Sequence, residues 1–423
     1  MQKLSLTNKY DPYPEYKDSG AEWIGSIPST WNKVSFRGFV KENREKNING
    51  GNTNLLSLSY GKIINKDIES NGGLLPESFN TYQVVHKGNL VLRLTDLQND
   101  KKSLRVGFVE QDNGIITSAY LGLKITDDFS HRFLYHLIHS YDLQKVFYNL
   151  GAGVRQTLDY KNMKYLPLLL PPKADQEKIA RFLDVQTARI DETIAKKQKL
   201  VELLKEKRTA VINHAVTKGL DSEVELVESG IDWIGKIPRS WEVKKLKHYL
   251  KNLDGKRIPL STDERTKMQG EYPYYGASGI IDYVNGYLFE EDLILISEDG
   301  ANLLNRSTPI SFIANGKYWV NNHAHIAKPK DGFLDFWSER VEQLDVSIFT
   351  SGSAQPKLTI HSLQNICISA PISILERKMI GEFVSNARKK YDTPLKKVNE
   401  SISKLQELKS SLISHAVTGK IKV

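Results

Sequence analysis

Cysteine is nearly missing from this sequence. Of 423 residues, one is a cysteine, Cys367, in the alternating stretch NICISAP. One cysteine excludes an internal disulfide framework and a zinc site built from several thiolates, and it fits a reducing compartment. The alternation predicts that Cys367 is a buried residue of a strand. We therefore expect a cytoplasmic protein whose fold depends on no covalent cross-link.

Long hydrophobic runs are also missing. No apolar stretch approaches the roughly 18 residues of a membrane helix, and the opening MQKLSLTNKYDPYPEYKD has no apolar core of the secretory type. Hydrophobic residues make up 40% of the chain and charged residues 26%, which is typical of a water-soluble protein. A chain of this length has room for two or three domains, each with its own core.

The sequence lacks the short motifs of several enzyme classes. It has no Asn-Pro-Pro-Tyr/Phe of an amino-methyltransferase, no G-x-x-x-x-G-K-[ST] phosphate loop and no H-E-x-x-H zinc motif. His323 and His325 share a strand face by their spacing, but metal-ligating carboxylates and cysteines are lacking nearby. Glu298 and Asp299 have no following lysine of the nuclease type and predict a turn. We therefore predict no catalytic residue, no metal and no cofactor bound by this chain.

The excess of positive charge is modest. The chain has 59 Lys+Arg against 50 Asp+Glu, a net charge of +9 and a pI near 9.1. Such a bias is compatible with a polyanionic partner, and equally with a charge that serves solubility alone. Composition leaves both alternatives open.

An internal repeat dominates the sequence. The stretch EWIGSIPSTW, Glu22 to Trp31, returns as DWIGKIPRSW, Asp232 to Trp241, and a Ser-Gly pair precedes both copies. The offset is 210 residues, since 233 − 23 = 210 for the first tryptophans. A repeat of this kind fixes the architecture before any other feature does. The two halves are therefore expected to share one scaffold.

A second repeat ends each half. AVINHAVTKGL, from Ala210, resembles SLISHAVTGKI, from Ser411, with an offset of 415 − 214 = 201 residues between the histidines. A heptad seam precedes each copy. Its positions are Leu183, Ile190, Lys197, Leu204 and Val211 in the first half, and Val384, Tyr391, Val398, Leu405 and Leu412 in the second.

The two seams predict long helices that pair with each other. A continuous helix from Ala174 to Asn213 has 40 residues and would be about 60 Å long, more than a domain core needs. A whole globular segment separates the two helices, which favours antiparallel pairing in a coiled coil. Pro394 predicts a kink or a fresh helix start in the second helix.

The segments between these landmarks are rich in short β-type runs broken by Gly, Asn and Asp. They show no clear mutual match until each ends in a glycine loop, GAGVRQTL from Gly151 and GSAQPKL from Gly352. The predicted division is a scaffold segment 1–31, a mostly β domain 32–166, a central scaffold with the first long helix 167–219, a repeat of the first segment 220–241, a second mostly β domain 242–366, and a distal scaffold with the second long helix 367–423.

Two related scaffolds in one chain make a pseudo-dimer. Two-fold proteins on DNA read two half-sites at a spacing that the protein geometry sets. Since the two β domains differ, the half-sites would differ, and the target would be bipartite and asymmetric. The alternative is a non-catalytic coiled-coil adaptor that joins proteins without sequence-specific DNA binding.

The combined features resemble a known family. The duplicated Trp-Ile-Gly-x-Ile-Pro-x-x-Trp elements, the paired helices ending in His-Ala-Val-Thr and the alternating variable domains are similar to the DNA-specificity subunit of type I restriction–modification systems. VLRLTDLQND, GASGII, LISEDGANLL and VNNHAHI also resemble segments of its target-recognition domains. The resemblance covers essentially the whole chain.

The resemblance implies a DNA-binding subunit of α+β fold and no enzyme. Two target-recognition domains would each read a few base pairs, and the antiparallel coiled coil would fix their spacing. Two methyltransferase subunits would dock on the scaffold, bind S-adenosylmethionine and flip an adenine for N6-methylation. Restriction subunits with motor and nuclease activity would join in some complexes, and no membrane is involved.

Polar residues of the β domains are the candidates for DNA contact. Arginine suits guanine, Asn and Gln suit adenine, and lysine suits phosphate. In the first domain and its glycine loop the candidates are Arg93, Thr95, Asp96, Gln98, Asn99, Lys101, Lys102, Arg105, Arg155 and Gln156. In the second they are Tyr274, Tyr275, Ser278, Asn302, Asn305, Arg306, Asn321, Asn322, His323 and Gln355. The alternatives are a polar hairpin for the stretch 93–105, core positions for Tyr274 and Tyr275, and structural hairpins or methyltransferase contacts for the glycine loops.

The repeated tryptophan elements have two interpretations. They pack each variable domain against the helices, or they form a docking surface for the methyltransferase. The residues concerned are Trp23, Ile27, Trp31, Trp233, Ile237 and Trp241.

Overall fold

The structure of the chain is a computed structural model that describes residues 10–66, 78–95, 97, 104–150, 157–352 and 355–423. It divides into two compact units. Unit 1 comprises Met1–Gln198 and Glu400–Val423, and unit 2 comprises Lys199–Asn399. Each unit therefore combines one β domain with part of each long helix.

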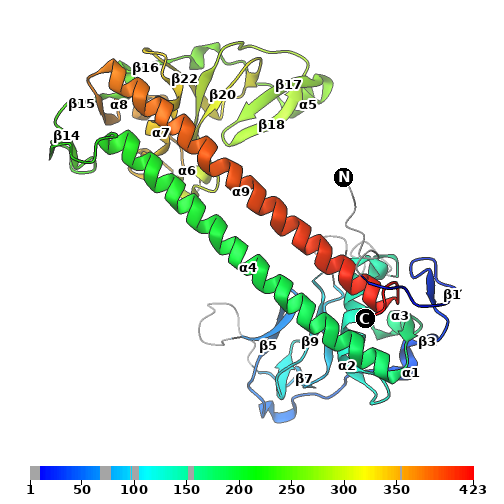
Figure 1. Cartoon of the computed structure of the whole chain (residues 1–423). Coiled ribbons are helices and arrows are strands. Elements are labelled where there is room, and N and C mark those ends of the chain that lie inside the picture. The colour runs from blue at the N-terminus through cyan, green and yellow to red at the C-terminus, as the bar shows by residue number, and fades with distance from the viewer. Residues whose placement is uncertain (1–9, 67–77, 96, 98–103, 151–156, 353–354) are drawn as a thin grey trace. The chain divides into compact units, whose positions relative to one another are not determined.

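A four-stranded antiparallel sheet forms the centre of unit 1, in the order β4-β11-β8-β9 (Figure 1). Its strands are β4 (Val40–Glu42), β8 (Leu90–Leu92), β9 (Val106–Phe108) and β11 (Leu121–Ile125). Two antiparallel pairs, β5-β6 and β7-β10, extend the domain. They are β5 (Leu56–Ser59), β6 (Lys62–Asn65), β7 (Gln83–His86) and β10 (Asn113–Ile116).

Unit 2 has a sheet of the same topology, in the order β16-β22-β19-β20. Its strands are β16 (Leu250–Asn252), β19 (Leu293–Ser297), β20 (Ser311–Ala314) and β22 (Ala324–Pro329). A different addition, the three-stranded sheet β18-β17-β21, replaces the two extra pairs of unit 1. It consists of β17 (Gln269–Gly276), β18 (Gly279–Val284) and β21 (Trp319–Val320).

The two β domains are thus more alike than their sequences indicate. In each, the last strand of the sheet in chain order, β11 or β22, leads into a helix, α2 (His131–Leu143) or α7 (Leu334–Glu342). Each domain also closes with a short helix, α3 (Tyr160–Met163) or α8 (Ile360–Asn365), before its last strand. The two sequences show no clear mutual match, yet the central sheet is shared and only the added strands differ.

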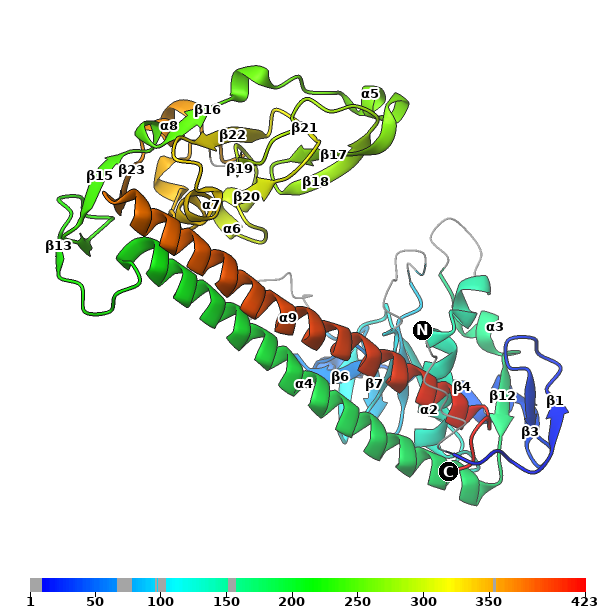
Figure 2. The same ribbon diagram turned by 45° about the horizontal axis from the view of Figure 1, so that its top comes forward.

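A two-stranded ribbon closes the base of each domain. In unit 1, β3 (Asn32–Ser35) pairs with β12 (Pro167–Leu170), and the two lie side by side in Figure 2. In unit 2, β15 (Trp241–Lys245) pairs with β23 (Cys367–Pro371). Cys367 lies in a strand, as predicted, but it is half-buried and not buried.

The repeated tryptophan elements form small hairpins that precede these ribbons. The strands are β1 (Tyr16–Asp18) with β2 (Ser26–Pro28), and β13 (Leu226–Glu228) with β14 (Lys236–Pro238). Trp31 is 0% exposed, and its ring makes edge contacts with Tyr13 and Phe133. It belongs to a core cluster that also contains residues of both long helices, among them Leu183 and Leu412. The same arrangement buries Trp241 in unit 2.

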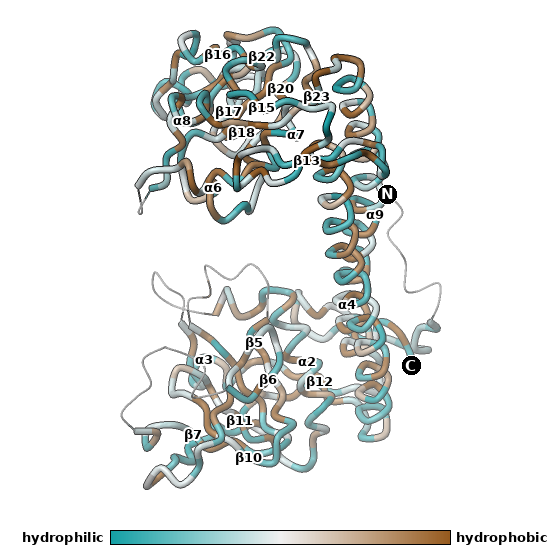
Figure 3. Tube along the Cα trace, turned by 90° about the vertical axis from the view of Figure 1, so that its left-hand side faces the viewer, coloured by the Kyte–Doolittle hydropathy of each residue, from teal (hydrophilic) through white to brown (hydrophobic). Residues whose placement is uncertain are grey.

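The long helices are α4 (Lys173–Lys218) and α9 (Ile374–Val417), of 46 and 44 residues. Both carry hydrophobic and hydrophilic residues interspersed along their length in Figure 3. In unit 1, Asp191 of α4 pairs with Lys409 of α9, and in unit 2 Arg208 pairs with Asp392. Figures 1 and 2 show α4 and α9 side by side in each unit and running in opposite directions, so the helices are antiparallel, as predicted.

Pro394 lies inside α9, and the helix does not restart there. Proline has no backbone N–H to donate within the helix, so α9 lacks one intrahelical hydrogen bond at this position. The remaining short elements are α1 (Phe36–Phe39), α5 (Thr262–Lys267), α6 (Asn302–Asn305), and the 3-10 turns η2 (Ile48–Gly50), η4 (Val146–Asn149), η5 (Leu246–His248), η6 (Asp254–Lys256) and η7 (Ser347–Phe349). Among the described residues, no helix has both the length and the apolar character needed to cross a membrane.

Candidate nucleic-acid interface

Four loops gather at one end of the strands of the central sheet in unit 2, which we call the loop edge. The loop after β19 meets the turn before β22, since the Glu298 N–H donates to the His323 carbonyl at 2.9 Å. It also meets the glycine loop, where Leu358 N–H donates to the Glu298 carbonyl at 2.7 Å. The turn between β17 and β18 joins them, because the Ser297 hydroxyl donates to the Ala277 carbonyl. Two backbone hydrogen bonds and one side-chain hydrogen bond therefore place the four loops together at this edge.

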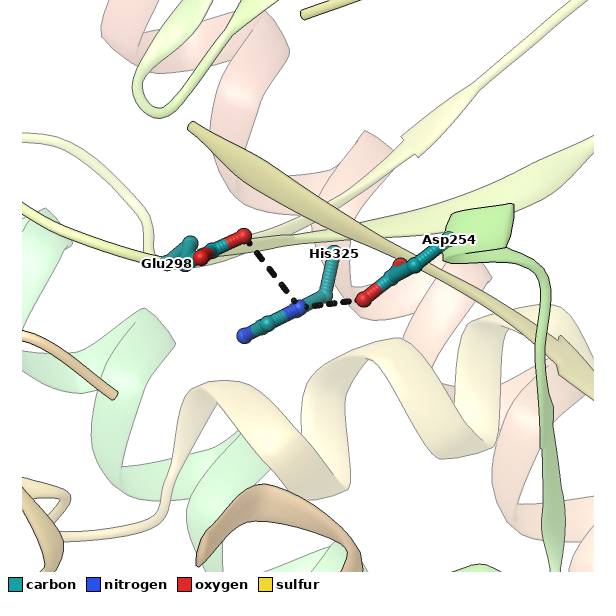
Figure 4. Close-up of side chains that lie close together, drawn as sticks. All are labelled: Asp254, Glu298 and His325. Atoms are coloured by element: carbon teal, nitrogen blue, oxygen red, sulfur yellow. Dashed lines mark hydrogen bonds and ion pairs between the residues drawn. The ribbon is translucent and has the colours of Figure 1, made fainter. Parts of the chain in front are cut away.

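An ion-pair network lies beneath this edge (Figure 4). His325 Nδ1 lies 2.7 Å from Asp254 Oδ2 and 3.6 Å from Glu298 Oε2, and its Nε2 faces the Leu358 carbonyl at 2.8 Å. Arg257 Nη1 contacts Glu298 Oε2 at 2.8 Å. The network thereby connects the glycine loop to the sheet.

The pKa of Glu298 reflects this network. Burial acts to raise the pKa of the carboxyl, but hydrogen bonds from Arg257 and Lys357 and the charge of His325 outweigh it, so the pKa is lowered. Glu298 therefore remains ionised at neutral pH. It holds Lys357 of the glycine loop at 3.1 Å.

The same three residues form a geometric candidate for a metal site. Asp254, Glu298 and His325 offer ligand atoms within 4.8 Å of one another. However, Arg257 and Lys357 already occupy the carboxylates, and both ring nitrogens of His325 face oxygen acceptors. A cation would have to displace two positive side chains, so these residues fit an internal ion-pair network better than a metal.

The environment of the two histidines differs from the prediction. Carboxylates were expected to be lacking around His323 and His325, and they are present. Asp299 lies 2.8 Å from His323 Nδ1, and Asp254 and Glu298 flank His325. They come from segments 24 to 71 positions away in sequence, which local spacing cannot reveal. Glu298 and Asp299 do lie in the loop that follows β19.

Unit 1 builds a corresponding edge from different residues. Arg93 N–H donates to the Arg105 carbonyl at 2.9 Å, and Leu158 N–H donates to the Leu94 carbonyl at 2.9 Å. These bonds match Ser297 to Ile310 and Leu358 to Glu298 in unit 2, each at 2.7 Å. The loop after β8 is thus the counterpart of the loop after β19. The shared hydrogen bonds show that the framework of the edge is repeated while its side chains are not.

The predicted DNA-contacting residues fall into four groups in the structure. Those with exposed side chains are Arg93, Ser278, Asn305, Asn322, His323 and Gln355. Those that are half-buried are Thr95, Tyr275, Asn302 and Arg306. Those that are buried are Arg105, Tyr274 and Asn321. Those that lie outside the described residues are Asp96, Gln98, Asn99, Lys101, Lys102, Arg155 and Gln156.

Burial and internal hydrogen bonds argue against direct DNA contact by the three buried residues. Tyr274 is 0% exposed, and its hydroxyl accepts a hydrogen bond from Leu260 N–H at 2.9 Å. The Arg105 guanidinium donates to the carbonyls of Arg93 and Thr95. Asn321 Oδ1 accepts from His323 N–H at 2.8 Å. Their polar groups are used to hold loops in place.

Two of the half-buried candidates also have structural partners. The Arg306 guanidinium donates to the carbonyls of Glu342 and Leu344. The Asn302 side chain bonds the backbone of Thr308 in both directions, at 2.9 and 3.0 Å. Both residues shape the segment after β19.

Sequence reasoning missed Lys357, whose side chain is 50% exposed at this edge. Its place two residues after Gln355 in the glycine loop was the available signal. Arg257 was also missed, because nothing in its local sequence indicates that it reaches Glu298, 41 residues away.

The tryptophan elements support packing within each unit. The Trp23 and Tyr141 rings pack edge to face with their centroids 4.5 Å apart, and the Ile27 side chain is 1% exposed. In unit 2, Ile237 is 5% exposed, while Trp233 remains 39% exposed beside Phe349. Packing accounts for most of these side chains, and Trp233 retains free surface.

Comparison with known proteins gives a consistent result. The family model described as type I restriction modification DNA specificity domain matches residues 28–203 and 238–403. A putative type I restriction enzyme specificity subunit of Haemophilus influenzae is 36% identical over 132 residues, 31% of this chain and 33% of that protein. The MjaVIII specificity subunit of Methanocaldococcus jannaschii is 25% identical over 346 residues, 73% of this chain and 75% of that protein.

The fold agrees with a solved structure. A chain from a structure described as showing complex assembly and conformational transition of the type I R-M system superposes with a TM-score of 0.64 at 15% identity, over 92% of this chain and 98% of that chain. At this identity the likeness concerns the fold. The family model matches most of the chain, once in each half of the internal repeat. The chain therefore belongs to the family of type I restriction–modification DNA-specificity subunits and has two recognition domains.

Proposed function

We propose that the two recognition domains bind double-stranded DNA as the two halves of one bipartite, asymmetric target. The observation that carries the proposal is the repeated loop edge. Its backbone hydrogen bonds are the same in both units, from Leu158 to Leu94 and from Leu358 to Glu298. Its exposed side chains differ, with Arg93 in unit 1 and Asn322 and Gln355 among those of unit 2. A shared backbone framework that carries different exposed side chains fits two different half-sites.

The pairing of α4 with α9 sets the distance between the half-sites. Ion pairs on the helix pair support this role, from Asp191 to Lys409 at 2.6 Å and from Arg208 to Asp392 at 2.9 Å. Asp191 and Arg208 flank the stretch 195–205 of α4, and Asp392 and Lys409 flank the stretch 396–406 of α9. A spacer of paired helices is stiff enough to transmit a fixed length.

The chain acts without catalysis of its own. Two methyltransferase subunits dock on it, bind S-adenosylmethionine and methylate adenine at N6, and restriction subunits join where the system has them. Family membership supports these partners. The ion-pair network at Asp254, Glu298 and His325 serves structure, because its charged groups are already paired.

Methylome sequencing tests the proposal. Cells would co-express this chain with its cognate methyltransferase subunit, and the control would omit this chain. N6-methyladenine confined to one split, asymmetric motif is the expected result. A complex that forms and leaves no methylated motif would favour the coiled-coil adaptor and refute the DNA-reading function.

A paired insertion tests the spacer. Adding one heptad within 195–205 and one within 396–406 lengthens each helix by about 10 Å, which corresponds to roughly three base pairs of B-DNA at 3.4 Å each. We expect both half-sites to stay the same and the gap between them to widen by that amount. An unchanged gap in a methylation-competent variant would refute the spacer role. A heptad inserted in one helix only is the control and should abolish methylation.

A further inference from the structure

The helix of each recognition domain that packs on the scaffold carries charged side chains, and the contact in unit 1 is cationic on the domain side. Arg132 of α2 places Nε 3.0 Å from Asp184 Oδ2 of α4. His136, four residues later, places Nε2 2.8 Å from Asp184 Oδ1. The His136 side chain is 3% exposed, and Arg132 and Asp184 are about one-third exposed. We call these three residues the unit 1 seat.

The contact in unit 2 has the opposite polarity. Asp335 of α7 lies 2.8 Å from Arg388 Nη1 of α9. Glu339, four residues later, lies 2.6 Å from Arg388 Nη2, and its side chain is 5% exposed. Here the domain supplies two carboxylates and the scaffold supplies the guanidinium. We call these three residues the unit 2 seat.

The two seats occupy corresponding positions. Helix α2 follows β11 and α7 follows β22 in sheets of the same order. The residues that follow Arg132 and Asp335, Phe133 and Phe336, are both 0% exposed. This alignment matches Arg132 with Asp335 and His136 with Glu339. The charge is therefore reversed at the first of these positions, and the second position holds a histidine in unit 1 and a carboxylate in unit 2.

The scaffold side is exchanged as well. The repeat offset of 201 residues matches Asp184 with Ser385, and Arg388 with Thr187. The first half thus has an aspartate where the second half has a serine. The second half has an arginine where the first half has a threonine. The seat charges are complementary within a unit and mismatched between units.

Another ion pair of the scaffold keeps its polarity under the same repeat. Asp191 corresponds to Asp392, and Arg208 corresponds to Lys409, by the same offset. Both acid–base pairs form, at 2.6 and 2.9 Å. Reversal is therefore specific to the contact between domain and scaffold and is not a general drift of charges between the halves.

We propose that the seats are a charge key that lets each half of the scaffold accept only its own recognition domain. The two halves share sheet topology, hairpins and helix register, so an interchanged domain would otherwise fit the other half. The first domain on the unit 2 scaffold would bring Arg132 against Arg388. The second domain on the unit 1 scaffold would bring Asp335 and Glu339 against Asp184, with Glu339 buried and without a cation. Like charges in a partly buried contact oppose both exchanges.

A chimera with the recognition domains interchanged is the first test. It would be made on the native scaffold and on a scaffold whose seat residues are exchanged as well, by Asp184→Ser with Thr187→Arg and Ser385→Asp with Arg388→Thr. Hydrogen exchange of the transplanted domain helices reports whether they dock. We expect the matched chimera to protect them at least about tenfold better than the unmatched one, as for a buried pair left without its partner. Equal protection of the transplanted helices in two folded chimeras would overturn the key.

A charge-reversal cycle in the natural chain keeps the proposal testable if both chimeras fail to fold. The variants are Asp335→Arg, Arg388→Asp and the two together, with Glu339→Gln in every background so that one ion pair is examined. We expect each single reversal to raise the exchange rate of α7 and the double reversal to restore it to within about threefold of the parent. If the effects of the singles simply multiply in the double, no charge key exists at this seat.

The matched control reverses Arg208 and Asp392 in the same way. This pair has the same polarity in both halves and therefore carries no information about which domain belongs where. Its side chains are 28% and 55% exposed. Reversal there should leave the exchange of α7 unchanged, and a change as large as at the seat would refute the specificity of the key.

Discussion

His139 should make the stability of unit 1 sensitive to mildly acidic pH. It lies on α2, is 9% exposed, and its Nδ1 has no hydrogen-bond partner among the described residues. Burial, together with the positive charges of His136 and Lys409, lowers the pKa of His139 from 6.5 to about 3. In the folded chain the imidazole is therefore neutral at every pH above about 4.

The direction in which stability changes with pH follows from the pKa values of His139 in the folded and unfolded chain. The unfolded chain takes up a proton on this imidazole near pH 6.5, whereas the folded chain does not until near pH 3. The stabilisation is complete above the unfolded pKa and is lost as the pH falls below it. Each pH unit below 6.5 costs about 1.4 kcal/mol, so a change from about pH 7.5 to 5.5 costs about 1.4 kcal/mol of unfolding free energy at this residue alone.

His139→Phe isolates this contribution. The ring of His139 stacks on Tyr135 at 6.0 Å, and phenylalanine keeps a planar ring there without a titrating nitrogen. Urea unfolding of the full chain at the two pH values, followed by pulsed hydrogen exchange of peptides from α2, reads unit 1 separately. We expect the variant to lose about 1.4 kcal/mol less than the native chain on acidification.

The outcome is specific to His139. His136 also has a pKa lowered by burial, against the opposing hydrogen bond to Asp184, and it remains in both proteins. The difference between the two proteins therefore reports His139 together with its electrostatic coupling to His136. If the native chain and the variant lose the same free energy, His139 titrates normally in the folded state and the reasoning is refuted.

Three further predictions concern the scaffold. Trp31→Ala removes a 0% exposed side chain and should destabilise unit 1 by about 3–5 kcal/mol in urea unfolding; a loss below about 1 kcal/mol would contradict its core role. Gly419→Ala should destabilise more than Gly219→Ala by thermal unfolding, because both have positive φ but only at 419 would the new Cβ lie 2.4 Å from another side-chain atom; equal losses would show that backbone strain alone matters. A double-mutant cycle on Asp191 and Lys409 should give a coupling of about 0.2–1 kcal/mol, since both side chains are partly exposed, and a coupling above about 2 kcal/mol would contradict this.

The scaffold was accessible from the sequence because its signals are local and repeated. Heptad spacing predicted a helix from Ala174 to Asn213, and α4 runs from Lys173 to Lys218. The extra turn beyond Asn213 contains the His-Ala-Val-Thr element, whose Ala215 and Val216 are buried. Repetition of the tryptophan elements similarly indicated two equal corners.

The common topology of the β domains was not accessible. Strands such as β8, with three residues, pair with partners about 30 positions away, and their order depends on those long-range contacts. The extra strands of each domain differ, which masks the shared sheet in a comparison of sequences. Two unrelated side-chain patterns can satisfy one set of backbone hydrogen bonds.

Candidate DNA contacts were chosen by chemical type, and burial then decided differently for several of them. Arg105 has the guanidinium of a base reader, but the structure turns it toward the carbonyls of Arg93 and Thr95. Whether an arginine faces solvent or supports a loop depends on the path of another segment. His325 illustrates the same limit, since its partner Asp254 is 71 residues away.

The two ends of the described chain meet in unit 1, and this has a consequence for the order of folding. The Tyr16 hydroxyl donates to the Gly419 carbonyl at 3.0 Å, and Lys422 N–H donates to the Asp11 carbonyl at 2.8 Å. Core residues Leu412 and Val417 of α9 are needed to complete the first cluster. Unit 2, in contrast, is continuous from Lys199 to Asn399.

During synthesis the ribosome therefore releases every residue of unit 2 before the residues that complete unit 1. Domains generally fold as they emerge, so the second recognition domain can be finished while the first still lacks one wall of its core. The apolar surface of Trp31 and its neighbours must wait for the last helix turns. A chaperone that protects nascent chains would accordingly be needed longer for the first half of this protein than for the second.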